Sequence, residues 1–297
     1  MRARSGVDEL VVEVAGGRRV TARLHGTGAP VLFLHGTPGS RVLAPHDDDL
    51  LADSGVQLVT LDRPGYGGSA PQPGRRVLQC VDDVVEVANA VGAEHFGLAA
   101  YSGGALYALA TAAGHADRVT SVALVSPLGP LDTSGDERAL PEDRALQVRF
   151  LRAVPAATRA RVAIAALALR RVARQRLNQP QEAVDELGAS CAADARVLDD
   201  DRVRGMLEHD VVESLRQGAA GWAADAATMV ERWPVDPHAI RAPITVWHGR
   251  DDADVRIDMA RALSRWLPAA ALVEVPDAGH LVLHTIWPDV LTAARPG

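Results

Sequence analysis

Short apolar runs that alternate with helical patterns constrain the fold of this chain more than any other feature of its sequence. Runs at Pro30 to His35, Val56 to Asp62, His95 to Tyr101 and Val119 to Ser126 are typical of strands buried on both faces of a sheet. Between two of them, Arg75 to Val91 carries apolar residues at helical spacing. This alternation predicts an α/β fold, with a doubly wound, mostly parallel sheet covered by helices on both faces.

The two ends of the chain extend this pattern. Glu9 to Ala15 and Arg18 to His25 flank a pair of glycines, which predicts an antiparallel hairpin. Further apolar runs at Pro243 to His248 and Leu272 to Pro276 predict two more strands. A last helix is expected over Leu281 to Ala294, unless the proline within it interrupts it.

The middle of the chain differs from its ends. Residues 128–235 contain helical segments rich in Ala, Arg and Leu, with little strand character. We therefore predict one α/β core, built from residues 1–127 and 236–297, with a helical insertion over 128–235 that follows the sixth predicted strand.

Several loops that follow predicted strands carry chemically unusual residues. They are His35-Gly36-Thr37-Pro38-Gly39-Ser40, Asp62-Arg63-Pro64-Gly65-Tyr66-Gly67-Gly68-Ser69, the segment around Ser102, and His248-Gly249-Arg250-Asp251-Asp252, which Asp277-Ala278-Gly279-His280 follows later. Because the carboxyl ends of parallel strands lie at one edge of a sheet, we expect these loops to form one cleft.

The segment Ala100-Tyr101-Ser102-Gly103-Gly104 would place a serine at the apex of a sharp strand-to-helix turn. Alone, it also fits an ordinary turn. A serine in such a turn usually lies in Gly-x-Ser-x-Gly, and Ala100 replaces the first glycine. Strand and helix cross closely there, so the residues two before and two after the serine must be small. Because alanine adds a single methyl group, we expect the turn to form.

Taken together, these motifs resemble those of the α/β-hydrolase superfamily. The similar features are H-G-T-P-G, D-R-P-G-Y-G-G-S, A-Y-S-G-G, H-G-R-D-D and A-G-H, in that order. The order Ser…Asp…His is also that of the family. The helical insertion lies where the family carries its cap, so the resemblance covers the whole chain.

The resemblance implies a catalytic triad. Ser102 would be the nucleophile, His280 the general base, and Asp252 the acid that orients the imidazole. Asp252 has the family's Gly-x-x-Asp spacing from Gly249, whereas Asp251 and Asp254 are nearby alternatives.

The resemblance also implies an oxyanion hole and its supports. The backbone N–H groups of Thr37 and Gly103 would stabilise the oxyanion, with a cis bond before Pro38. The supporting residues would be Ala100, Tyr101, Gly104, His35, Gly36 and Pro38. We expect His35 and His248 to hold loops by hydrogen bonds, and the loop of Arg63 and Tyr66 to support the serine turn.

Composition limits the partners. The net charge of −7 argues against nucleic acid, which requires a basic face. Cys80 and Cys191 have no metal-binding spacing, and they fit a reducing, cytoplasmic compartment. We expect no metal, no cofactor, no secretory signal and no membrane span. The oligomeric state and the substrate stay open.

These features predict a serine hydrolase that cleaves an ester, lactone, thioester or activated carbonyl of a small apolar molecule through an acyl-enzyme. An aspartate at the position of Ser102 would have indicated an epoxide hydrolase or haloalkane dehalogenase. An acyltransferase or cyclase would use the same triad with another acceptor. A ligand-binding protein on a scaffold that has lost catalysis is the third alternative, to which Ala100 points weakly.

Overall fold

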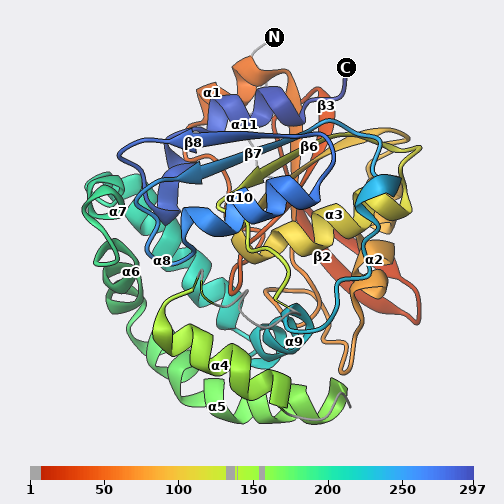
Figure 1. Ribbon diagram of the computed structural model, residues 1–297. Helices are drawn as coiled ribbons and strands as arrows, with labels where there is room; N and C mark the ends of the chain where they lie inside the picture. Colours follow the sequence, from red (N-terminus) through yellow and green to blue (C-terminus); the bar gives the residue numbers. More distant parts are fainter. Residues whose placement is uncertain (1–7, 132–137, 139, 154–157) are drawn as a thin grey trace.

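A central sheet carries the loops that the sequence analysis singled out as candidates for a catalytic site (Figure 1). The computed structural model describes residues 8–131, 138, 140–153 and 158–297. Within them, one eight-stranded sheet has the order β1-β2-β4-β3-β5-β6-β7-β8. The strands are β1 (Asp8–Val14), β2 (Arg18–His25), β3 (Ala29–Leu34), β4 (Val56–Leu61), β5 (Phe96–Tyr101), β6 (Val119–Val125), β7 (Ile244–Gly249) and β8 (Ala270–Val275).

The pairing of the strands confirms the predicted mixed sheet. Strands β1 and β2 form the expected antiparallel hairpin, and β2 also pairs antiparallel with β4. From β4 through β3 and β5 to β8, all neighbours are parallel. The carboxyl ends of the parallel strands therefore face one edge, as an α/β sheet requires for a shared cleft.

Helices cover both faces of the sheet (Figure 1). On one face, α2 (Val77–Ala90), α3 (Ala105–Gly114) and α10 (Ile257–Trp266) pack on the strands. On the other, α1 (Asp48–Ser54) and α11 (Trp287–Ala294) do so. Helix α3 is buried over nearly its whole length, and its small side chains allow this close packing on the sheet.

Further helices separate β6 from β7 and lie together beyond one edge of the sheet (Figure 1). They are α4 (Glu142–Ala153), α5 (Thr158–Asn178), α6 (Pro180–Gly188), α7 (Ala192–Val197), α8 (Asp201–Leu215) and α9 (Ala220–Met229). Their place in the sequence agrees with a helical insertion after the sixth strand, while the domain boundaries at 127 and 235 stay a prediction. None of the helices that the structure describes has the length and apolarity needed to cross a membrane.

The C-terminal helix differs from its prediction. Instead of one helix over Leu281 to Ala294, the chain forms a 3-10 turn over His280–His284 and then begins α11 at Trp287. Pro288 lies in the first turn of α11. A proline is tolerated there because the first N–H groups of a helix have no intrahelical partner.

Candidate active site

Ser102 occupies the predicted turn between β5 and α3. Its φ of 50° is in the left-handed region, where a non-glycine residue is strained. A Cβ added to Gly104 would lie 2.2 Å from the carbonyl oxygen of Leu34 in β3. Ala100 is buried and pairs with Leu34 and Leu124 on the adjacent strands. The turn therefore forms with alanine at this position, and its close crossing requires Gly104.

Asp252 and His280 meet at the carboxyl ends of β7 and β8. The Nδ1 atom of His280 lies 2.8 Å from Oδ2 of Asp252, and both side chains are buried. Of the two alternative acids, Asp251 is exposed, and Asp254 forms an ion pair at 2.8 Å with Arg144 of α4. The structure thus brings Asp252 to the imidazole.

Each member of this pair alters the ionisation of the other. Burial alone would raise the pKa of Asp252, but His280 and His248 outweigh it and hold that pKa well below its ordinary value. Burial alone would lower the pKa of His280, but the Asp252 carboxylate outweighs burial and raises it. A carboxylate that accepts the Nδ1 proton leaves Nε2 as the basic nitrogen.

The histidines before Gly36 and Gly249 make structural contacts. His35 Nδ1 lies 2.8 Å from the Gly36 carbonyl oxygen, and its Nε2 accepts the backbone N–H of Arg63. His248 Nε2 lies 2.7 Å from the Val255 carbonyl oxygen and also 3.1 Å from Asp252 Oδ2. This second contact, on the candidate acid itself, goes beyond the loop-holding role that the sequence suggested.

His280 is held beside the serine turn by its own backbone. Its carbonyl oxygen accepts the hydroxyl groups of Tyr101 and Ser126, each at 3.1 Å. The rings of Tyr101 and His280 lie 5.1 Å apart, and Tyr101 directly precedes Ser102. Within the described residues, the Ser102 hydroxyl and the His280 ring form no direct hydrogen bond. The structure therefore places the His280 ring against Tyr101, the residue that precedes Ser102.

The two candidate oxyanion donors are also neighbours. A Cβ on Gly103 would lie 2.6 Å from Thr37 Oγ1 and 2.4 Å from the terminal methyl of Met229. The Thr37–Pro38 peptide bond is cis, as the resemblance implied. Met229 ends α9, so an apolar side chain from the helical insertion lies beside Gly103.

Sequence reasoning missed three buried aspartates of the insertion that contact the candidate catalytic loops. Asp194 of α7 accepts the backbone N–H groups of His280 and Leu281. Asp210 of α8 accepts the backbone N–H and hydroxyl of Ser40. Asp225 of α9 accepts the hydroxyl of Thr37 and Nη2 of Arg63. The one sequence signal was that Asp225 is the only charged residue in A-G-W-A-A-D-A-A-T-M.

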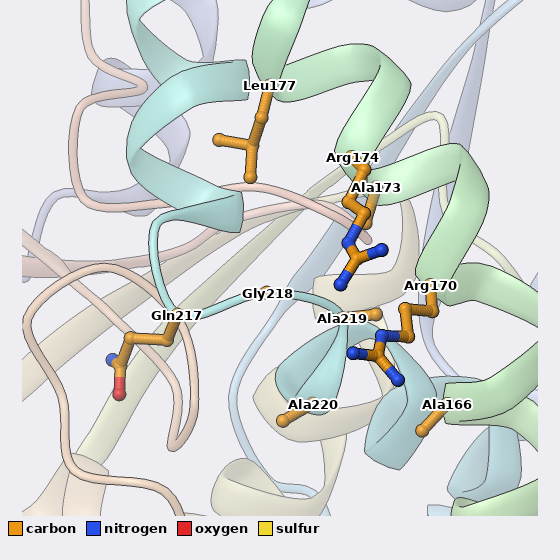
Figure 2. Close-up of a pocket in the computed structure, with 9 residues that line it drawn as sticks. All are labelled: Ala166, Arg170, Ala173, Arg174, Leu177, Gln217, Gly218, Ala219 and Ala220. Carbon is orange, nitrogen blue, oxygen red and sulfur yellow. The ribbon is translucent and has the colours of Figure 1, made fainter.

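A separate cavity of about 340 Å³ lies between α5 and the start of α9. Figure 2 shows the side chains of Arg170 and Arg174 extending from α5 toward the segment of Gly218 and Ala219. None of the predicted catalytic residues lines this cavity. Among the residues that the structure describes, no cluster of His, Cys, Asp or Glu could hold a metal ion.

The sequence matches known proteins over different lengths. Epoxide hydrolase B of Mycobacterium tuberculosis is 35% identical over 102 residues, which are 33% of this chain and 29% of that protein. The dihydrolipoyllysine-residue acetyltransferase component of the acetoin cleaving system of Cupriavidus necator is 36% identical over 118 residues, 39% of this chain and 31% of that protein. The match thus spans less than a third of either relative's length.

Solved structures match almost the whole chain. An esterase of Thermogutta terrifontis has a TM-score of 0.68 at 23% identity, covering 96% of both chains. An esterase of Exiguobacterium antarcticum has a TM-score of 0.69 at 15% identity, covering 96% of this chain and 97% of its own. At such identities, the likeness establishes the fold alone. The family model described as "alpha/beta hydrolase fold" matches residues 29–285, and the chain therefore belongs to the alpha/beta hydrolase fold family.

Proposed function

We propose that this protein is a serine hydrolase that cleaves an ester, lactone, thioester or activated carbonyl of a small apolar molecule. The contact of His280 Nδ1 with Asp252 Oδ2, beside a serine at positive φ, is the observation that carries the proposal. The contact supplies an imidazole of fixed orientation for the Ser102 hydroxyl. Acyl transfer through a serine requires such a base.

The reaction would proceed in two halves. The Ser102 oxygen attacks the carbonyl carbon while His280 Nε2 takes the hydroxyl proton, and Asp252 stabilises the resulting imidazolium. The backbone N–H groups of Thr37 and Gly103 stabilise the oxyanion. His280 then returns the proton to the leaving group, and an acyl-Ser102 ester remains. A water molecule activated by His280 attacks this ester, releases the acid and restores the serine.

The hydrogen bond between Ser102 and His280 would form when substrate enters. Catalytic hydrogen bonds in empty sites are often long or poorly aligned, and they shorten in the Michaelis complex. The methyl group of Met229 beside Gly103 favours an apolar group on the substrate near the oxyanion donors.

The proposed serine nucleophile predicts acyl transfer, not the epoxide opening that the names of the epoxide hydrolase relatives indicate for those proteins. This chain has Ser102 where an aspartate would point to epoxide opening. The ligand is a small molecule, and the chemistry requires neither metal nor cofactor. Cys80 and Cys191 are both free, which fits the cytoplasmic location that we expect.

A substrate panel tests the proposal. The panel comprises p-nitrophenyl esters of increasing acyl length together with small lactones, and it compares wild type with Ser102→Ala and His280→Ala. We expect hydrolysis by wild type and a loss of at least about 10³-fold in each variant. Comparable hydrolysis by Ser102→Ala would refute the proposal. Product analysis with and without an added alcohol distinguishes hydrolysis from acyl transfer.

A further inference from the structure

We infer that Asp225, a buried carboxylate of the helical insertion, is a positioning residue that fixes the peptide carrying the Thr37 oxyanion donor. This inference rests on the proposed function, because it assigns the backbone N–H of Thr37 to the oxyanion hole. Asp225 does not touch the reacting atoms. It acts through the hydroxyl of Thr37 and through the guanidinium of Arg63.

Asp225 is fully buried, and both of its carboxylate oxygens have partners. Oδ2 accepts the Thr37 hydroxyl at 2.9 Å, Arg63 Nη2 at 2.6 Å and the Tyr66 hydroxyl at 2.8 Å. Oδ1 accepts the Tyr107 hydroxyl at 2.6 Å, and it also accepts Arg75 Nη2. A carboxylate with this many donors has a fixed orientation, so α9 is joined rigidly to the core at this point.

Arg63 transmits that orientation to the backbone of the oxyanion loop. Its guanidinium donates to the carbonyl oxygen of His35, and Nη2 donates to that of Gly36 at 2.8 Å. The Gly36 carbonyl and the Thr37 N–H belong to the same peptide unit. In a trans peptide, these two groups point in opposite directions. Holding the Gly36 carbonyl against Arg63 therefore sets the direction of the Thr37 N–H.

The Thr37 side chain gives a second connection to the same carboxylate. Its hydroxyl accepts Arg63 Nη2 at 3.0 Å while donating to Asp225. The peptide and the side chain of Thr37 are thus both held by the Arg63–Asp225 pair. A rotation of this peptide would break the Gly36 contact in a buried site, where an unpaired carbonyl or guanidinium is costly.

The charge balance of the cluster explains why a carboxylate is needed. Arg63 and Arg75 are both almost fully buried, and each forms an ion pair with Asp225. Burial alone would raise the pKa of Asp225, but these two guanidinium groups outweigh burial and hold that pKa well below its ordinary value. Without the carboxylate, two buried cations would repel each other, and Arg63 would lose the group that directs it toward Gly36.

The primary test uses Asp225→Asn, with Asp185→Asn as a matched control. Asp185 belongs to the same insertion and forms an exposed ion pair with Arg204 at 2.6 Å. We measure kcat and KM for a p-nitrophenyl ester, together with amide hydrogen exchange of residues 35–40. For Asp225→Asn, we expect kcat to fall about 10- to 100-fold with KM nearly unchanged, because the donor is misplaced rather than absent. Exchange in this segment should become faster. The control should match wild type in both.

A second pair of variants tests the same inference if Asp225→Asn does not fold. Thr37→Val removes the hydroxyl but keeps the backbone N–H and the buried ion pairs, whereas Thr37→Ser keeps the hydroxyl. We expect Thr37→Val to have a kcat at least about 10-fold below that of Thr37→Ser. Equal kcat values in these two variants would overturn the inference.

Failure of this inference is distinguishable from failure of the proposed function. A folded Asp225→Asn protein with wild-type kcat, or with wild-type exchange over residues 35–40, overturns the positioning role. Wild type that hydrolyses no better than Ser102→Ala instead removes the proposed function. In that case, the exchange measurement alone decides whether Asp225 holds the loop.

Discussion

The Asp252 carboxylate divides its two oxygens between its own loop and the imidazole. Oδ1 accepts the backbone N–H groups of Asp254 at 2.9 Å and Val255 at 2.8 Å, while Oδ2 faces His280 and His248. The loop bonds fix the orientation of the carboxylate before substrate arrives. At the residue scale, this preorganisation is what the proposed catalysis requires of Asp252.

Replacing Asp252 with asparagine should keep the shape of the site and remove its function. Asparagine has one oxygen and one NH₂ group in place of the two carboxylate oxygens. If its oxygen accepts the loop N–H groups, its NH₂ group faces Nδ1 of His280 and favours the tautomer with the proton on Nε2. In the opposite orientation, the NH₂ group faces the loop N–H donors, and those bonds are lost. We expect kcat to fall about 10³- to 10⁴-fold. Asp251→Asn, which changes the adjacent exposed carboxylate, is the control and should retain wild-type kcat. A larger loss in Asp251→Asn than in Asp252→Asn would contradict the assignment.

The raised pKa of His280 gives the pH profile a defined direction. Burial alone would lower this pKa, but Asp252 outweighs burial and raises it above the ordinary value of about 6.5. The base must be neutral, so kcat/KM should fall as pH drops through this pKa, with a midpoint above about 6.5. In Asp252→Asn, the midpoint should move to lower pH. An acid limb that stays in place in this variant would show that another group titrates.

At the scale of elements, β5, the serine turn and α3 form one unit whose geometry depends on small residues. Beyond the contact with Leu34, a Cβ on Gly104 would lie 2.7 Å from the His35 carbonyl oxygen. Both oxygens belong to backbone, which cannot move aside cheaply. Side-chain size at this crossing therefore decides whether the serine reaches its strained conformation.

Two glycine substitutions at opposite ends of α3 test this dependence. Gly104→Ala should lower the free energy of unfolding by about 1–3 kcal/mol, because the added methyl overlaps the end of β3. Gly114→Ala is the control, since its Cβ would meet no atom within 4 Å. It should change stability by less than about 1 kcal/mol. Urea denaturation compares them, and an equal effect of the two changes would contradict the close crossing.

The sequence predicted the strands of the sheet and the loops that follow them well. Apolar runs such as Pro30 to His35 identified the strands because both faces of a parallel sheet are buried. The glycine-rich loops follow β3, β4, β5, β7 and β8, as the alternation of strands and helices predicted. Helix boundaries were harder to predict. A proline in the first turn of a helix cannot be distinguished in the sequence from one that interrupts a helix, so the start of α11 at Trp287 was missed.

At the scale of the whole molecule, the helical insertion and the sheet are joined through buried carboxylates. Asp194, Asp210 and Asp225 lie on α7, α8 and α9, and each contacts a loop at the carboxyl edge of the sheet. These contacts could not be predicted from sequence. An aspartate in a helical segment usually indicates a surface position. Its N–H and hydroxyl partners are distant in the sequence, so only the tertiary structure reveals them.

Asp210 predicts a pH-dependent stability of this junction. Burial raises its pKa to about 7, with the Ser40 hydrogen bonds acting in the opposite direction. Because the pKa of an aspartate in the unfolded chain is about 3.9, the folded state binds the Asp210 proton more tightly. The stability that this bound proton contributes is lost as pH rises from about 4 to about 7.

Asp210→Asn removes this titration while keeping both Ser40 bonds, which share one oxygen of Asp210. We expect the variant to gain about 1–3 kcal/mol in free energy of unfolding over wild type near pH 8, and less near pH 5. Urea denaturation at both pH values measures this. A gain that is the same at both pH values would rule out ionisation of Asp210 as its source.

Capture of the covalent intermediate tests the central claim most directly. The protein is treated with a fluorophosphonate, and the modified residue is located by peptide mass spectrometry. The account predicts stoichiometric modification of Ser102, and none in Ser102→Ala or in protein denatured beforehand. Modification at another residue, or equal labelling of Ser102→Ala, would contradict the nucleophile on which the proposed function depends.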